Sequence, residues 1–180
     1  MVGKMSFGRR QFDSIDEEMR KLIPIFHHSI SELTTLVDED TFAYKQYVEA
    51  MKLPSSNEEE IAIKRVAIKV GIKQAINVPL NLARKINQLW IPAKSLAGLI
   101  NISSASDLEV GVSCLELGTK AAMFNVSTNL DELESKDGAG DEDDANYKNQ
   151  VWNEINQLMK ESSESCAQIL GILDQRKRNN

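Results

Sequence analysis

Eight positions between residues 26 and 51 recur at alternating spacings of four and three, and this rhythm limits the fold more than any other feature. They are Phe26, Ile30, Leu33, Val37, Asp40, Tyr44, Tyr47 and Met51. Such spacing places all eight on one face of an α-helix, so it predicts a long helix with a buried apolar seam. Asp40 is the one carboxylate on that face, and an unpaired buried charge costs several kcal/mol. The pattern therefore gives Asp40 either a partner or a chemical role, such as proton transfer. A surface acid on a less buried stretch of the helix is the alternative.

The rest of the sequence predicts a single all-α domain, residues 1–180, built as a bundle of about five helices. The expected helices cover residues 15–52, 57–89, 92–99, 106–130 and 145–176. Asn57 with Glu60, and Ser106 with Glu109, have the spacing of N-terminal capping boxes. Pro79 is expected to kink or split the second helix. Residues 134–146 are acidic and contain glycine, which predicts a flexible loop.

Composition excludes several classes of function. The formal net charge is -6 without an extended basic stripe, which argues against nucleic-acid binding. No Cys/His cluster has zinc-ligand spacing, and His27 and His28 point about 100° apart on a helix, so no metal site is expected. Cys114 and Cys166 cannot form a multi-bridge framework, and this favours a reducing, cytoplasmic setting. Cys114 is expected in the core. No apolar run is long enough to cross a bilayer.

Five further residues are candidates for substrate binding. Two adjacent guanidinium groups, Arg9 and Arg10, precede the first long helix and are suited to clamping a carboxylate; a solvated basic segment is the alternative. Asn125 and Asn129 lie four apart, hence on one helix face. Their amides can read the donors and acceptors of a heterocycle, or they merely satisfy backbone groups. Asp107 supports its helix start electrostatically, whatever else it does.

Six short stretches together resemble a known family. They are "MSFGRRQF", "LTTLVDED", "YVEAMKLP", "VPLNLA", "SDLEVG" and "FNVSTNL". In order and spacing they resemble the cyclodeaminase domain of formimidoyltransferase-cyclodeaminases, which is related to methenyltetrahydrofolate cyclohydrolases. The resemblance covers nearly the whole chain except the acidic segment. It implies an all-helical enzyme that forms a homodimer or a higher homo-oligomer.

The resemblance also implies a reaction and a site. The family converts 5-formimidoyltetrahydrofolate to 5,10-methenyltetrahydrofolate and ammonia in histidine degradation and one-carbon metabolism. Its catalytic aspartate falls on Asp40, the residue that the seam had already marked. Substrate contacts are expected from Arg9, Arg10, Asp107, Asn125 and Asn129, with the arginines on the carboxylates of a polyglutamylated tetrahydrofolate. No metal is implied.

The sequence also departs from the family pattern. The family domain begins earlier, with a further helix and a glycine-rich turn, so this chain is expected to be shortened at its N-terminus. A formimidoyltransferase domain is an expected partner within a longer protein. The alternative function is a catalytically incomplete helical module, derived from this domain, that serves oligomerisation or interaction. No nucleic acid and no membrane span are expected.

Overall fold

The computed structural model of this chain describes residues 2–6, 10–137 and 142–179. The four long helices are α2 (Asp16–Met51), α3 (Glu58–Asn87), α5 (Ala105–Asp137) and α6 (Glu142–Arg178). The shorter elements are α1 (Val2–Ser6), α4 (Trp90–Leu99) and two 3₁₀ turns, η1 (Arg10–Ile15) and η2 (Ile102–Ser104). No strand occurs within these described ranges, and the predicted all-α bundle of about five helices is confirmed.

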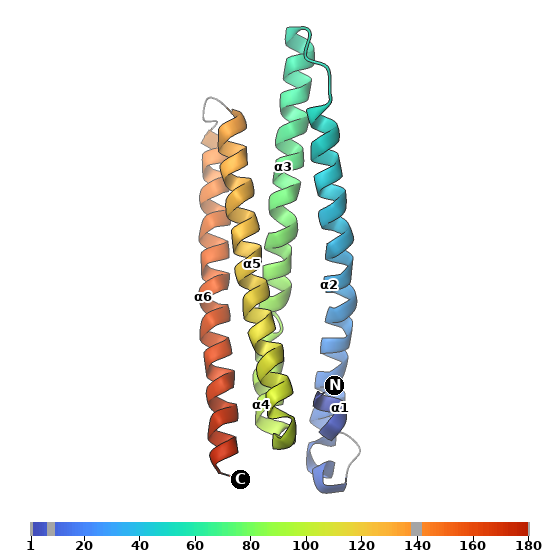
Figure 1. The fold of residues 1–180 in the computed structure, drawn as a ribbon, viewed down its shortest axis with the longest axis vertical. Coiled ribbons are helices and arrows are strands. Elements are labelled where there is room, and N and C mark those ends of the chain that lie inside the picture. Colours follow the sequence, from blue (N-terminus) through green and yellow to red (C-terminus); the bar gives the residue numbers. More distant parts are fainter. Residues whose placement is uncertain (1, 7–9, 138–141, 180) are drawn as a thin grey trace.

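Two antiparallel helix pairs stand side by side in the bundle (Figure 1). One pair is α2 with α3 and the other is α5 with α6, so α2 and α5 run in the same direction. The central element is α3, which packs against α2, α5 and α6. The tip of the α2–α3 pair rises beyond the ends of α5 and α6. The apolar side chains of Ile61, Ile63 and Val66 on this tip are consequently more than half exposed.

The α2–α3 pair begins and ends close to the predicted residues because local signals define it. The Asn57 side chain accepts the Glu60 backbone N–H at 2.9 Å, as the predicted cap requires. The Glu60 carboxylate accepts the Ser56 N–H at 2.7 Å rather than that of Asn57. Helix α3 runs through Pro79 without a break, so the expected split does not occur.

Gly71 of α3 packs directly against the backbone of α2 at Tyr47. A Cβ atom at Gly71 would lie 3.0 Å from the Tyr47 Cα. That distance is tighter than nine in ten real Cβ contacts, so a side chain at this position would require the α2 backbone to shift by a few tenths of an ångström. The close approach explains a glycine that would otherwise cost about 1 kcal/mol within a helix.

The boundaries of α5 and α6 differ from the predicted ones. Helix α5 begins at Ala105, because the η2 turn leads directly into it, and Glu109 binds Lys177 of α6 at 2.5 Å instead of capping the helix. Residues 134–137 and 142–146, predicted as loop, are helical. The remaining residues of that predicted loop, 138–141, lie outside the described part of the chain. The physical reason for the early start of α6 is an ion-pair cluster around Asp144, described below.

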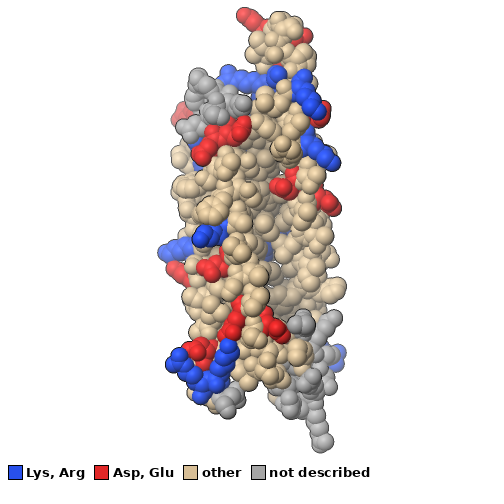
Figure 2. All heavy atoms as spheres, in the orientation of Figure 1, with Lys and Arg blue, Asp and Glu red and all other residues tan. Residues whose placement is uncertain are grey.

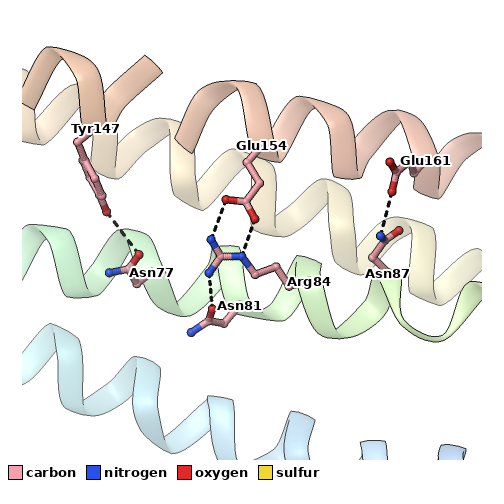
Figure 3. Close-up of polar contacts among 7 residues, drawn as sticks. All are labelled: Asn77, Asn81, Arg84, Asn87, Tyr147, Glu154 and Glu161. Carbon is pink, nitrogen blue, oxygen red and sulfur yellow. Dashed lines mark hydrogen bonds and ion pairs between the residues drawn. The ribbon is translucent and has the colours of Figure 1, made fainter. Parts of the chain in front are cut away.

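Polar contacts join α3 to α6 along the length of the bundle (Figure 3). Arg84 binds Glu154 through both carboxylate oxygens, with donor–acceptor distances of 2.6 and 2.7 Å. This hydrogen bond holds the pKa of the Glu154 carboxyl below its usual value. The Asn87 amide donates to Glu161 at 2.9 Å in the same ladder. These contacts fix the register of α6 against α3. They lie beside a core of aliphatic side chains.

Candidate functional site

A groove separates the parallel helices α2 and α5, because both pack on α3 far more than on each other. Its lower half widens into a cavity of about 660 Å³. Phe26, Ile30 and Leu33 of α2 face Gly111 and Leu115 of α5 across this cavity. Uncharged side chains cover most of the face between the two helices (Figure 2). The cavity is therefore suited to a flat, largely apolar group.

Polar residues at the cavity wall are few. They are His27, Ser29 and Asp107. His27 is exposed at the edge of the cavity. Asp107 lies in the first turn of α5, where its carboxylate also suits the helix dipole.

One hydrogen bond bridges the groove above the cavity. The Tyr47 hydroxyl on α2 donates to Glu132 Oε1 on α5 at 2.6 Å. Burial, followed by this hydrogen bond, raises the pKa of Tyr47 to about 12. The phenol therefore stays a donor at neutral pH, and its contribution to stability is present below pH 10 and lost as the pH rises through about 12. The bridge fixes both the spacing and the register of α2 against α5.

This register places Asp40 level with Asn125. Asp40 precedes Tyr47 by seven residues, and Asn125 precedes Glu132 by seven residues. Seven residues are close to two helical turns, so both side chains leave their helices on the flank that carries the bonded pair, about 10.5 Å below it. The two predicted residues thus lie on the two walls of one groove.

The predicted burial of the α2 seam is wrong for the single chain. Ile30, Val37 and Tyr44 are 65%, 66% and 66% exposed, and Asp40 is exposed as well. Helix α2 contributes only Met19, Leu22, Ala43 and Ala50 to the buried set. The periodicity correctly identified an apolar face, but no described part of this chain covers it.

The two asparagines of α5 differ in their surroundings. The Asn129 amide donates to the backbone oxygen of Ala75 on α3 at 2.8 Å and is partly buried. This contact matches the structural alternative for Asn129. Asn125 is exposed.

The remaining predicted site residues lie at the opposite end of the bundle. Asp107 precedes Asn125 by 18 residues, which is about 27 Å along α5. Arg10 begins η1, ahead of α2, and the 24 residues from the start of α2 to Asp40 span about 36 Å. Arg9 lies outside the described residues. Within one chain, the register places Asp40 and Asn125 at one level of the bundle, with Asn129 about one helical turn above them, and it separates Asp107 and Arg10 from them.

Sequence reasoning missed the contact between Tyr47 and Glu132. Tyr47 had been placed on the seam, but nothing in the sequence pairs it with a residue 85 positions away. Both cysteines are free, and Cys114 is exposed rather than in the core, whereas Cys166 is buried. Among the described residues, no group of three His, Cys, Asp or Glu side chains is placed to hold a metal ion. None of the described helices is long and apolar enough to span a membrane.

Replacing Tyr47 by phenylalanine is expected to lower the free energy of unfolding by about 1.5–3 kcal/mol, because the lost bond has a charged acceptor. Urea unfolding measures this loss. A double-mutant cycle with Glu132→Leu separates the bond from the other effects of each substitution. A coupling energy near zero would show that the two side chains do not interact.

The fold and groove define an all-helical bundle whose candidate site lies between two parallel helices. Comparison with known proteins identifies the family. The chain belongs to the formiminotransferase-cyclodeaminase family, whose model matches residues 1–144. The resemblance found in the sequence motifs is therefore confirmed.

Individual relatives agree with this family. The chain is 41% identical to formimidoyltransferase-cyclodeaminase of Mus musculus over 177 residues, which are 98% of this chain and 31% of the relative. It is 37% identical to that of Dictyostelium discoideum, over 98% of this chain and 30% of the relative. The chain thus spans less than a third of the curated relatives it matches. The crystal structure of formiminotetrahydrofolate cyclodeaminase from Thermotoga maritima has a TM-score of 0.77 at 19% identity, covering 97% of this chain and 79% of that one. This likeness shows the shared fold.

Proposed function

We propose that this chain acts as a formimidoyltetrahydrofolate cyclodeaminase, which converts 5-formimidoyltetrahydrofolate to 5,10-methenyltetrahydrofolate and ammonia. One observation supports the assignment above the others. The family's catalytic aspartate falls on Asp40, and Asp40 lies in the groove level with the amide of Asn125. The apolar cavity, whose uppermost lining residue on α2 is Leu33, about 10.5 Å below Asp40 along the helix, offers space for a pterin ring.

The reaction needs one group that both removes and returns a proton. The folate N10 attacks the carbon of the formimidoyl group, which enters the reaction as the protonated amidinium. The N10–C bond forms, the five-membered ring closes, and the C=NH₂⁺ group becomes an amino group. Asp40 takes the proton from N10 and delivers it to the amino group of the intermediate. The C–N bond to that amino group then breaks, ammonia leaves, and the electron pair of N5 completes the methenyl cation. A positioned carboxylate is sufficient for both proton transfers.

Asn125 and Asn129 are suited to holding the substrate during these steps. An amide offers both donors and an acceptor, which a pterin ring can use on its polar edge. Asn129 donates to the backbone oxygen of Ala75, which holds its side-chain amide in one orientation. Tetrahydrofolate is the substrate carrier in this scheme, and its one-carbon unit supplies the reacting carbon.

A second copy of the chain is part of this proposal. Helix α5 carries exposed apolar residues Val110, Leu117 and Phe124 at spacings of seven, on the other side of the groove from the exposed seam of α2. Two such unpartnered faces on one molecule favour association into a homodimer or higher homo-oligomer. Association would remove Asp40 from bulk water, as proton transfer between substrate atoms requires.

The purified chain is therefore expected to self-associate. Sedimentation velocity over a range of protein concentrations measures the effect, and Val37→Glu with Leu117→Glu should shift the protein toward the monomer. A stable monomer of the unchanged chain at all concentrations would contradict the expected assembly.

The exposed position of Asp40 also favours the second candidate function, a catalytically incomplete module that only associates. A direct assay separates the two. The protein is mixed with 5-formimidoyltetrahydrofolate, and the near-ultraviolet absorbance of the methenyl product is followed together with ammonia. Equal amounts of both products support the enzyme. Absence of both, in a protein that still forms oligomers, supports the module. A formimidoyltransferase partner, which the names of the relatives suggest, and a cytoplasmic setting belong to the same proposal.

A further inference from the structure

The Tyr47–Glu132 hydrogen bond is one side of a triangle of contacts that joins three helices. Tyr47 of α2 donates to Glu132 of α5 at 2.6 Å. The Tyr47 backbone also lies against Gly71 of α3, where an added Cβ atom would be 3.0 Å from the Tyr47 Cα. The third side joins α5 to α3, because the Asn129 amide donates to the Ala75 oxygen at 2.8 Å. Each helix of the triangle is thus held by the other two.

The three contacts lie at consistent heights in the bundle. Along α3, which runs opposite to α2 and α5 (Figure 1), Ala75 lies about 6 Å below Gly71. Along α5, Asn129 lies about 4.5 Å below Glu132. The two steps agree within about 1.5 Å, so the triangle occupies little more than one helical turn. A closed triangle resists tilting, whereas two helices that are each held only by a third can move apart at their outer edges.

Asp40 and Asn125 lie on the two helices that the Tyr47–Glu132 bond joins, each about 10.5 Å below it. Helices α2 and α5 are continuous between the two levels, so a change of spacing at the bond is carried to the level of Asp40. We propose that Tyr47 and Glu132 are positioning residues for the cyclodeaminase reaction, and that their bond sets the separation between Asp40 and the opposite wall of the groove. This inference rests on the proposed function, because it takes Asp40 as the group that transfers the protons.

The geometry keeps Tyr47 itself out of the proton transfers. Its hydroxyl already donates to Glu132, and burial, followed by this bond, raises the pKa of Tyr47 to about 12. A phenol with that pKa stays protonated near neutral pH and is poorly matched to acid–base catalysis there. It also lies about 10.5 Å from Asp40 along the helix, well beyond hydrogen-bond reach. The pair therefore acts through Asp40 rather than on the substrate.

The separation of the two walls matters because proton transfer has a short range. The catalytic group and the atom that exchanges the proton must come within about 2.6–3.2 Å. A misplacement of about 1 Å can cost on the order of 10²-fold in rate, even when the altered residue is remote from the reacting atoms. Substrate binding is spread over the cavity wall and depends less on this one separation. Loss of the bond should therefore lower kcat far more than affinity.

The test compares three variants at a temperature at which all of them are folded. It measures kcat for 5-formimidoyltetrahydrofolate and affinity for 5-formyltetrahydrofolate, which cannot release ammonia. Tyr47→Phe removes the donor of the bond, whereas Glu132→Gln keeps an oxygen that accepts from the phenol. Glu154→Leu is the matched control, because it removes a bond with a carboxylate acceptor, from Arg84, that joins α3 to α6 instead of α2 to α5 (Figure 3).

Tyr47→Phe is expected to lower kcat on the order of 10- to 100-fold and to leave the affinity within about threefold. The fall should be the same at every pH from about 6 to 9, since the phenol does not titrate there. Glu132→Gln should stay within about threefold of the unchanged protein, and Glu154→Leu within about twofold. Full kcat in Tyr47→Phe would overturn the inference. An equal fall in Glu154→Leu would also overturn it, by assigning the loss to stability, and an equal fall in Glu132→Gln would assign it to the charge.

A distance measurement separates this inference from the proposed function. Nitroxide labels are attached at Asp40→Cys and Asn125→Cys after Cys114→Ser has removed the exposed native thiol, while Cys166 is buried. Labelled protein is diluted with unlabelled protein, and dipolar broadening of the electron paramagnetic resonance spectrum measures the separation within one chain. Adding Tyr47→Phe should shift or widen that separation. Turnover together with a spectrum that Tyr47→Phe leaves unchanged would contradict the inference alone. No turnover in the unchanged protein would contradict the proposed function, and the positioning role would fall with it.

Discussion

Asp40→Asn is expected to reduce turnover of 5-formimidoyltetrahydrofolate by roughly 10²–10⁴-fold, the range typical of a lost acid–base catalyst. Asparagine keeps the shape and most of the hydrogen-bonding capacity of the side chain, but it cannot accept and return a proton. Folate affinity should change far less, since the lost interaction belongs to the transition state. Steady-state kinetics and equilibrium binding on the same preparation measure the two quantities.

Asp38→Asn is the matched control for this experiment. Asp38 lies two residues away, which is about 200° around the helix, and it borders a different hollow, between α2 and α3. The substitution removes the same charge from the same helix without changing the groove. Full turnover in Asp40→Asn, or equal losses in both variants, would remove Asp40 from the mechanism.

The structure also changes what Asp40→Asn should do to stability. If the seam were buried, removing the charge of Asp40 would raise the free energy of unfolding. Asp40 is exposed in the single chain, and surface substitutions usually alter the free energy of unfolding by less than about 0.5 kcal/mol. A stability change near zero in the monomer, with a larger change in the oligomer, would locate Asp40 at the contact between copies.

Local sequence signals were sufficient for the first helix pair. Asn57 accepts the expected backbone N–H, and the break after Met51 is followed by proline and serine, so the boundaries of α2 and α3 fall within a residue or two of their predicted positions. Periodicity likewise identified the apolar face of α2. It could not show what covers that face, because spacing records which residues share a side of a helix and contains nothing about their neighbours.

Contacts distant in sequence account for what the sequence did not predict. Asp40 and Asn125 were selected separately, yet their common level follows only from the Tyr47–Glu132 bond, with Asn129 one helical turn above them. A hollow of about 290 Å³ is lined by Lys64, Arg65 and Lys69 of α3, Ser55 of the α2–α3 connection and Leu133 of α5. No local sequence pattern predicts it. The start of α6 at Glu142 was not predicted for the same reason. The sequence shows the acidic residues of this segment, but not that Asp144 binds Lys69 and Lys73 of α3.

Asp144 supplies the second large expected effect. It lies in the first turn of α6 within the segment predicted as loop, and it is only 4% exposed. Its carboxylate binds Lys69 and Lys73 of α3, the latter at 2.5 Å. Lys73 in turn lies over the ring of Tyr147, with its ammonium 4.8 Å from the centroid. One carboxylate on α6 therefore binds two ammonium groups on α3.

Asp144→Ala is expected to lower the free energy of unfolding by about 2–4 kcal/mol. Removing one member of a buried ion pair costs about 3–5 kcal/mol, and the partial exposure of both lysine side chains reduces that value here. The two ammonium groups would then lose the carboxylate that binds them both. Urea unfolding measures the loss, and amide hydrogen exchange in the first turns of α6 should accelerate with it.

Two further variants separate the ion pairs from other effects at the helix start. Glu142→Ala removes an exposed acid from the same first turn, so it shares the helix-dipole term and should cost at most about 1 kcal/mol. Asp144→Leu combined with Lys69→Met and Lys73→Met replaces the whole cluster by apolar groups, which should restore much of the stability because no unpaired charge remains. Equal losses in Asp144→Ala and Glu142→Ala would mean that the cluster contributes nothing beyond the dipole. A triple variant less stable than Asp144→Ala would show that α6 is held by the charges themselves rather than by the contact area they bring together.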